Sequence, residues 1–122
     1  MSKSVYLAGG MKDGWQDEVI GALRGWVIYD PRAHGLTNPA DYTQWDLEHI
    51  RAADVVVAYI DSMNPSGYGM SIEIGYAHAL GKPIVLIDRL ADWRGRYWDM
   101  ARQVCVVVKD TSSAIERLEG TP

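Results

Sequence analysis

The feature that most constrains the fold is an alternation of short apolar runs with longer segments of helical pattern. The apolar runs have four to seven residues and are expected at 5–8, 26–29, 54–60, 84–87 and 104–108. Helical patterns are expected at 15–23, 41–53, 70–80, 97–102 and 112–118, the last capped by Thr111 or Ser112. Runs that are apolar throughout, each followed by a helix, predict parallel strands buried on both faces.

Right-handed crossovers between such strands give a doubly wound α/β sandwich, flavodoxin-like or Rossmann-like, with one five-stranded parallel sheet. We expect the strand order 2-1-3-4-5, which reverses between the first and third strands. Ligands of such folds bind at the carboxyl ends of those strands, which here lead into residues 8–15 and 61–73. A chain of 122 residues has room for one core, so residues 1–122 are predicted to form a single domain.

Composition excludes several classes of protein. The net charge of −4 argues against a sequence-independent grip on DNA or RNA. No apolar run approaches the roughly 20 residues of a membrane span, and the first residues lack a signal-peptide pattern, so we expect a cytoplasmic protein. The single Cys105 lies in an apolar run and reads as part of the core. His34, His49 and His78 lack metal-ligand spacing, so no metal site and no cofactor are predicted.

Glu73 is the most informative single residue. It lies inside a predicted helix that is apolar almost all round, with no Lys or Arg within four residues to pair with it. Its carboxylate either reaches a pocket or shares a narrow exposed stripe with Ser71 and His78. Gly67 and Gly69 precede it, and they either form a turn or let backbone N–H groups approach a polar ligand.

Tyr6, Asp46, Asp61 and Asn64 are weaker candidates. Tyr6 lies in a predicted buried strand, where its hydroxyl needs a partner, either backbone or a carboxylate in the crevice. Asp46 has no basic neighbour one helical turn away, and taken alone it reads as a surface acid. Asp61 and Asn64 follow the third strand on the ligand side, either as ligands or as turn formers.

Several segments together resemble the nucleoside 2-deoxyribosyltransferase family, including its relatives that hydrolyse nucleotide N-glycosidic bonds. The most specific is Glu-Ile-Gly-Tyr-Ala at 73–77. The matching segments are 5–9, 46–50, 53–58, 67–77 and 80–83. Their order and spacing also fit the family, whose fold is the same doubly wound sandwich.

The resemblance implies a role for each candidate. Glu73 would be the nucleophile, Tyr6 would hydrogen-bond and orient its carboxylate, and Asp46 would help to protonate the leaving nucleobase. The loop 61–69 would hold the 5′ end of the sugar. The predicted substrate-binding residues are Gly9, Asp61, Asn64, Ser66, Gly67 and Gly69.

By resemblance, the chain cleaves the N-glycosidic bond of 2′-deoxynucleosides through a covalent glycosyl-Glu73 intermediate and transfers the deoxyribosyl group to another nucleobase. An alternative is an N-glycosidase that hydrolyses deoxynucleoside 5′-monophosphates. Ser66 favours it, because many family transferases have an acid there, whereas a Ser beside exposed N–H groups suits a phosphate. A further alternative is a non-catalytic nucleotide-binding module.

The resemblance also bears on partners. Family transferases borrow a residue from a neighbouring subunit, and this short chain has little length left to close over a nucleoside. We therefore expect a homodimer or higher homo-oligomer. Its partners would be a small nucleoside or nucleotide and a nucleobase, with no nucleic acid polymer and no membrane.

Overall fold

The computed structural model describes residues 2–11, 13–62, 67–90 and 93–120. Its sheet has the strand order β2-β1-β3-β4-β5, and every neighbouring pair is parallel. The strands are β1 (Ser4–Gly9), β2 (Val27–Tyr29), β3 (Val55–Ile60), β4 (Ile84–Asp88) and β5 (Val106–Val108). The predicted α/β fold and its strand order are confirmed.

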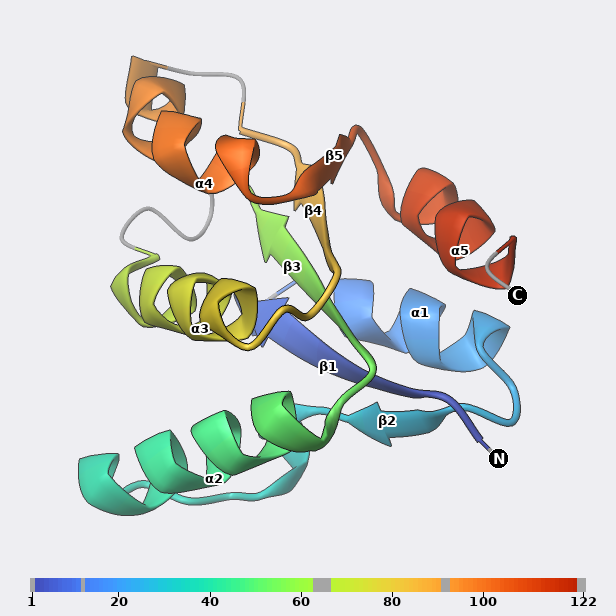
Figure 1. The fold of residues 1–122 in the computed structure, drawn as a ribbon, viewed down its shortest axis with the longest axis vertical. Helices are drawn as coiled ribbons and strands as arrows, with labels where there is room; N and C mark the ends of the chain where they lie inside the picture. Colours follow the sequence, from blue (N-terminus) through green and yellow to red (C-terminus); the bar gives the residue numbers. More distant parts are fainter. Residues whose placement is uncertain (1, 12, 63–66, 91–92, 121–122) are drawn as a thin grey trace.

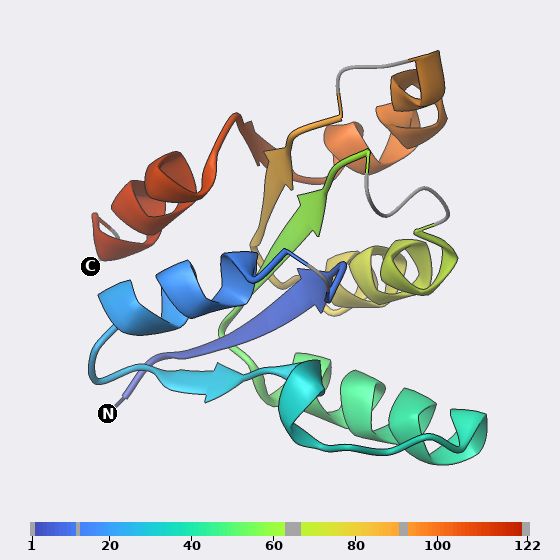
Figure 2. The same ribbon diagram turned by 180° about the vertical axis from the view of Figure 1, so that it is seen from behind.

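Helices cover both faces of the sheet (Figure 1). Helices α1 (Trp15–Ala22) and α5 (Thr111–Glu119) lie on one face, and α2 (Pro39–Ala52) and α3 (Tyr68–Ala79) lie on the other. The view from behind shows the same two layers (Figure 2). The remaining helical elements are the 3-10 helices η1 (Pro31–Ala33) and η2 (Trp93–Trp98), and the short α4 (Asp99–Gln103).

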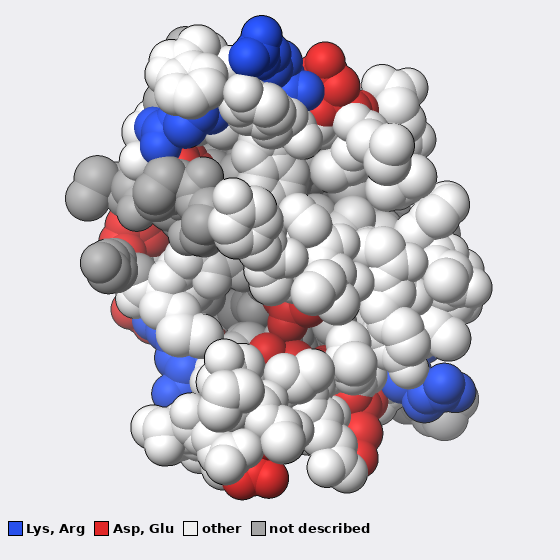
Figure 3. Space-filling model, turned by 90° about the vertical axis from the view of Figure 1, so that its left-hand side faces the viewer, with Lys and Arg blue, Asp and Glu red and all other residues white. Residues whose placement is uncertain are grey.

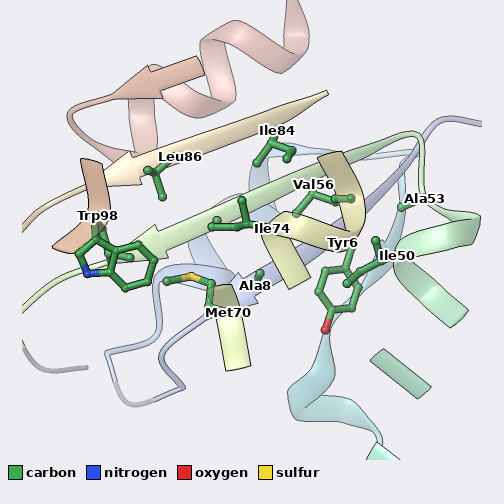
Figure 4. Packing of buried hydrophobic residues seen from close by; sticks show 13 residues of the cluster. Tyr6, Ala8, Ile50, Ala53, Val56, Met70, Ile74, Ile84, Leu86 and Trp98 are labelled. Atoms are coloured by element: carbon green, nitrogen blue, oxygen red, sulfur yellow. The ribbon is translucent and has the colours of Figure 1, made fainter. Parts of the chain in front are cut away.

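The alternation of side chains along β1 decides what each residue meets. Val5 and Leu7 belong to the core cluster beneath α1 and α5, whereas Tyr6 and Ala8 belong to the cluster beneath α2 and α3. In that second cluster Ile50 of α2 lies beside the Tyr6 ring, whose hydroxyl stands at the edge of the packed side chains (Figure 4). Strand β1 therefore places the buried Tyr6 ring beneath α2 and α3.

Two sequence expectations need correction. The cap predicted at Thr111 or Ser112 is wrong, because α5 begins at Thr111 and Asp110 is its N-cap. The Asp110 side chain accepts a hydrogen bond from the Ser113 N–H at 2.8 Å, which satisfies one of the free donors at the helix start. The fifth strand is also shorter than predicted, since it starts at Val106.

Cys105, just before that strand, is partly buried against the α2 and α3 cluster. Burial raises the pKa of its thiol to about 11, which suits a packing residue rather than a reactive thiol. Within the described part of the chain, no helix is long and apolar enough to cross a membrane.

Candidate active site

Tyr6 and Glu73 meet across 67 residues of sequence. The Tyr6 hydroxyl donates a hydrogen bond to Glu73 Oε2 at 2.5 Å, and Tyr6 itself is fully buried. This contact settles the alternatives that the sequence left open for Tyr6 and for Glu73. Tyr6 binds a carboxylate rather than backbone, and Glu73 faces inward, away from the exposed Ser71 and His78.

The carboxylate of Glu73 sits where its charge is costly. Burial is the main cause that raises its pKa to about 8, and Asp46 raises it further, while the hydrogen bond from Tyr6 lowers it. The pKa of Tyr6 is raised above its usual range by burial first and by Glu73 second, so Tyr6 remains a phenol and a donor. Glu73 and Asp46 therefore form a close pair of carboxyl groups that favours holding one proton between them.

Asp46 is brought into this group by α2. Its side chain is 20% exposed, and its interaction with both Tyr6 and Glu73 contributes to their raised pKa values. Taken alone in the sequence it read as a surface acid, and the structure instead turns it toward the other two residues. The three predicted catalytic side chains thus come together from β1, α2 and α3.

A cavity of about 280 Å³ opens over Asp46 and Glu73. Figure 3 looks onto a face of the molecule where Asp or Glu atoms lie within a hollow near its centre. The cavity is lined by Gly9, Tyr42, Thr43, Asp46, Leu47, Gly67, Tyr68, Gly69, Met70, Ile72 and Glu73. Its position at the ends of β1 and β3 is the one expected where strand order reverses.

The predicted substrate-binding residues divide into three groups. Gly9, Gly67 and Gly69 line the cavity, whereas Asp61, at the end of β3, is partly buried and is not among the lining residues. Asn64 and Ser66 lie outside the described residues. The structure thus places the three glycines, but not Asp61, at the cavity.

Gly67 is required where it stands. It has a φ of 55°, and a Cβ there would lie 2.3 Å from the Trp98 ring. The buried Trp98 of η2 therefore packs directly against Gly67, the N-cap of α3. The helical pattern predicted at 97–102 gave no sign of this contact, because Trp98 belongs to a 3-10 helix whose path the pattern does not indicate.

His34 is a second residue that sequence analysis missed. Its Nε2 lies 3.5 Å from Asp46 Oδ1, and it reaches the site from the segment after η1. Nothing in its spacing marks it, since it stands in a Pro- and Gly-rich stretch. Across the described ranges, no group of three or more His, Cys, Asp or Glu side chains is placed to hold a metal ion.

Residues 2–91 match the family model described as "Nucleoside 2-deoxyribosyltransferase like". This range includes Tyr6, Asp46 and Glu73. A search of curated proteins found no match.

Solved structures give three informative comparisons. The CMP N-glycosidase BcmB of Clostridium botulinum is 25% identical, with a TM-score of 0.68 over 96% of this chain and 98% of that one. A 2-desoxiribosyltransferase from Leishmania mexicana is 27% identical, with a TM-score of 0.60 over 74% of this chain and 65% of that one. A 2-deoxyribosyltransferase from Bacillus psychrosaccharolyticus shares the fold, at 22% identity and a TM-score of 0.70 over 92% of this chain and 90% of that one.

Proposed function

Because the chain belongs to the nucleoside 2-deoxyribosyltransferase-like family, we propose that it cleaves the N-glycosidic bond of a 2′-deoxynucleoside with Glu73 as nucleophile. The observation that carries this proposal is the contact between Tyr6 and Glu73 at the floor of a cavity that Asp46 also lines. A donor fixed on Oε2 leaves Oε1 of the same carboxylate to attack. Glycosidic cleavage passes through an oxocarbenium-like state, which an adjacent anion stabilises.

In the first step, a Glu73 oxygen forms a bond to the anomeric carbon as the bond from that carbon to the nucleobase nitrogen breaks. The electron pair of the broken bond goes to the nucleobase, which takes a proton from Asp46 and departs as a neutral base. The product is a glycosyl ester on Glu73. Tyr6 keeps its proton throughout and holds the carboxylate in place.

The two carboxyl groups suit this division of labour. Two carboxylates so close resist ionising together, so the pair tends to keep one proton near neutral pH. The donor bond from Tyr6 stabilises the anion on Glu73. The raised pKa of Glu73 keeps that proton on Glu73 until substrate binds. It then passes to Asp46, which leaves Glu73 ionised for attack and gives the nucleobase its proton.

In the second step, another nucleobase attacks the anomeric carbon, releases Glu73 and returns a proton to Asp46, so the deoxyribosyl group is transferred with net retention. The family match supports transfer. Hydrolysis of a deoxynucleoside 5′-monophosphate is the alternative, in which water replaces the second base. Ser66 favours it, as does the likeness to a CMP N-glycosidase over nearly the whole of both chains.

A product assay separates these reactions. The protein is incubated with deoxynucleosides or their 5′-monophosphates, with and without a second base, and the products are separated by chromatography. A new nucleoside that forms only with acceptor base supports transfer, and free base with free sugar or sugar phosphate supports hydrolysis. No turnover of any of these substrates would favour a non-catalytic binding module.

The matched pair of variants is Glu73→Gln and Glu48→Gln. Both remove one carboxylate, but Glu48 is exposed on α2, where its Oε1 accepts a hydrogen bond from the exposed Gln44 at 2.9 Å. Turnover should be lost in the first variant and kept in the second. Wild-type turnover in Glu73→Gln would contradict the proposed nucleophile.

The proposed working unit is at least a homodimer. At the cavity mouth, Tyr68 is 79% exposed and Ile72 is 64% exposed, although both are large and apolar. A second copy that covers them would also exclude water from the site. Light scattering at assay concentration should give at least twice the monomer mass, and a monomer with full turnover would contradict this expectation.

A further inference from the structure

His34 is held in a defined orientation beside Asp46. It follows η1 and its side chain is only 9% exposed. The backbone N–H of Leu36 donates a hydrogen bond to His34 Nδ1 at 2.9 Å. A ring nitrogen that accepts a hydrogen bond carries no proton, so the hydrogen-bond network assigns the proton of the neutral ring to Nε2.

The ring is also packed in place by aromatic neighbours. Trp45 meets His34 edge-on, with ring centroids 4.8 Å apart. His49 in turn holds Trp45 in place. Its ring stacks on the Trp45 ring with centroids 3.7 Å apart, and its Nδ1 lies 2.7 Å from the Trp45 carbonyl oxygen, within hydrogen-bond distance. The direction of the His34 Nε2–H bond is therefore set by the fold rather than by a freely turning side chain.

The atom that Nε2 faces is an unpaired acceptor. Asp46 Oδ1 is buried and has no hydrogen-bond partner among the described residues. Nε2 lies 3.5 Å from it, slightly beyond a direct hydrogen bond. Buried acceptors without partners are rare and costly, and hydrogen bonds in catalytic sites are often long until substrate binds.

We propose that His34 is a positioning residue for Asp46, whose Oδ1 it engages through Nε2–H when substrate binds. An oxygen that accepts this N–H bond cannot also carry the carboxyl proton on the same side. The proton of Asp46 is therefore held on Oδ2, the oxygen available to the departing nucleobase. This inference rests on the proposed function, because it assigns how the general acid of that reaction is oriented.

The test is a double-mutant cycle with a conservative rescue. His34→Leu removes the donor, His34→Gln keeps an N–H group near the position of Nε2, and each is made with and without Asp46→Asn. His34→Leu should lower kcat about 10- to 100-fold with little change in KM, and His34→Gln should restore most of it. On the Asp46→Asn background, His34→Leu should change kcat by less than about 2-fold.

A residue with a merely structural role would give another pattern. Losses that multiply in the double variant, or equal losses in His34→Leu and His34→Gln, would overturn the inference. His78→Leu is the matched control, because His78 is an exposed histidine on α3 outside the cavity. It should leave kcat unchanged.

A spectroscopic measurement separates failure of this inference from failure of the proposed function. Long-range ¹H–¹⁵N NMR reports the tautomer of each histidine, and the signal lost in His34→Leu identifies His34. The inference predicts the Nε2–H tautomer in wild type and a shifted Nε2 signal in Asp46→Asn. The Nδ1–H tautomer, or no shift, would overturn it even if the protein turned over no nucleoside.

Discussion

Strand β1 binds a carboxylate at two places, and the two differ in how fully the charge is satisfied. Near its amino end, Asp54 Oδ2 accepts hydrogen bonds from Ser4 N at 2.8 Å and from Ser4 Oγ at 3.1 Å, while the Asp54 N–H donates back to Ser4. Two residues further along, Glu73 receives a donor bond from Tyr6 and has Asp46 as a neighbouring acid. In the first arrangement hydrogen bonds satisfy the carboxylate, whereas in the second a buried carboxyl group has one donor and a second acid beside it.

The difference shows where the chain stabilises itself and where it prepares for chemistry. The Ser4 and Asp54 network ties the start of β1 to the start of β3, as the N–H bond from Asp54 to the Ser4 carbonyl also does. At the other place, burial first and the neighbouring Asp46 second raise the pKa of Glu73 to about 8, so the charge there is held at a cost. Local arrangements of this kind are typical of functional sites.

The largest expected effect is at Glu73. Glu73→Gln should lower kcat by roughly 10⁴-fold, because it removes the nucleophile and keeps the shape of the side chain. Its free energy of unfolding should not fall, since a neutral amide replaces a carboxyl that is costly to ionise. Steady-state kinetics measures kcat, and urea denaturation measures the free energy of unfolding. A Glu73→Gln variant that was destabilised but kept its activity would show that Glu73 is structural rather than catalytic.

Asp46 should come next. Asp46→Asn keeps the shape but cannot donate the carboxyl proton, so kcat should fall about 10²- to 10⁴-fold with ordinary nucleosides. A substrate with a leaving group that needs no proton, such as a 4-nitrophenyl 2-deoxyriboside, should be cleaved nearly as fast as by wild type. Equal losses on both substrates would show that Asp46 does not act as the acid.

Tyr6 should have a smaller effect with a distinctive pH dependence. The proton that Glu73 and Asp46 share is lost as the pH rises through the Glu73 pKa of about 8, so kcat/KM should fall there because no proton is left for the leaving nucleobase. The Tyr6 bond lowers that pKa, and Tyr6→Phe should therefore move the fall to higher pH and lower kcat/KM about 10- to 100-fold below it. A pH profile of each enzyme checks this; a fall that is unmoved or shifted to lower pH would contradict the account.

The smallest effect on turnover should come from the other end of β1. Asp54→Ala leaves the Ser4 N–H and hydroxyl without their acceptor, which should lower the free energy of unfolding by about 1–3 kcal/mol. Activity per folded molecule should stay within about 2-fold of wild type, because neither Ser4 nor Asp54 is among the described residues that line the cavity. Urea denaturation measures the free energy of unfolding, and active-site titration gives the activity per folded molecule. A large loss of kcat in Asp54→Ala would contradict the view that Asp54 is structural and Glu73 catalytic.

Much of this arrangement was predictable because it depends on periodic patterns. The apolar run at 5–8 is two residues shorter than β1, and the run at 84–87 is one residue shorter than β4, because an uninterrupted apolar run favours a buried strand. Glu73 stood out as an acid without a basic neighbour in an apolar helix. Its contact with Tyr6 was implied by the family resemblance, because the residues alone left the Tyr6 hydroxyl with either a backbone or a carboxylate partner.

What the sequence did not predict lies in segments without periodicity. His34 beside Asp46 comes from a Pro- and Gly-rich stretch, and Trp98 against Gly67 comes from a 3-10 helix, and both positions depend on the path of the chain. Asp110 became the N-cap of α5 because the chain leaves β5 at Val108 and turns at once into the helix. Such placements follow from tertiary contacts rather than from local composition.

The central claim is that Glu73 becomes covalently bonded to the sugar. A nucleoside carrying 2-fluorine on its sugar slows the second step more than the first, so the glycosyl-enzyme accumulates. After proteolysis, mass spectrometry should find the fluorinated sugar on Glu73, with about one equivalent of base released per active site in a burst. Release of base with the sugar bonded to another residue, or to none while turnover continues, would contradict the account.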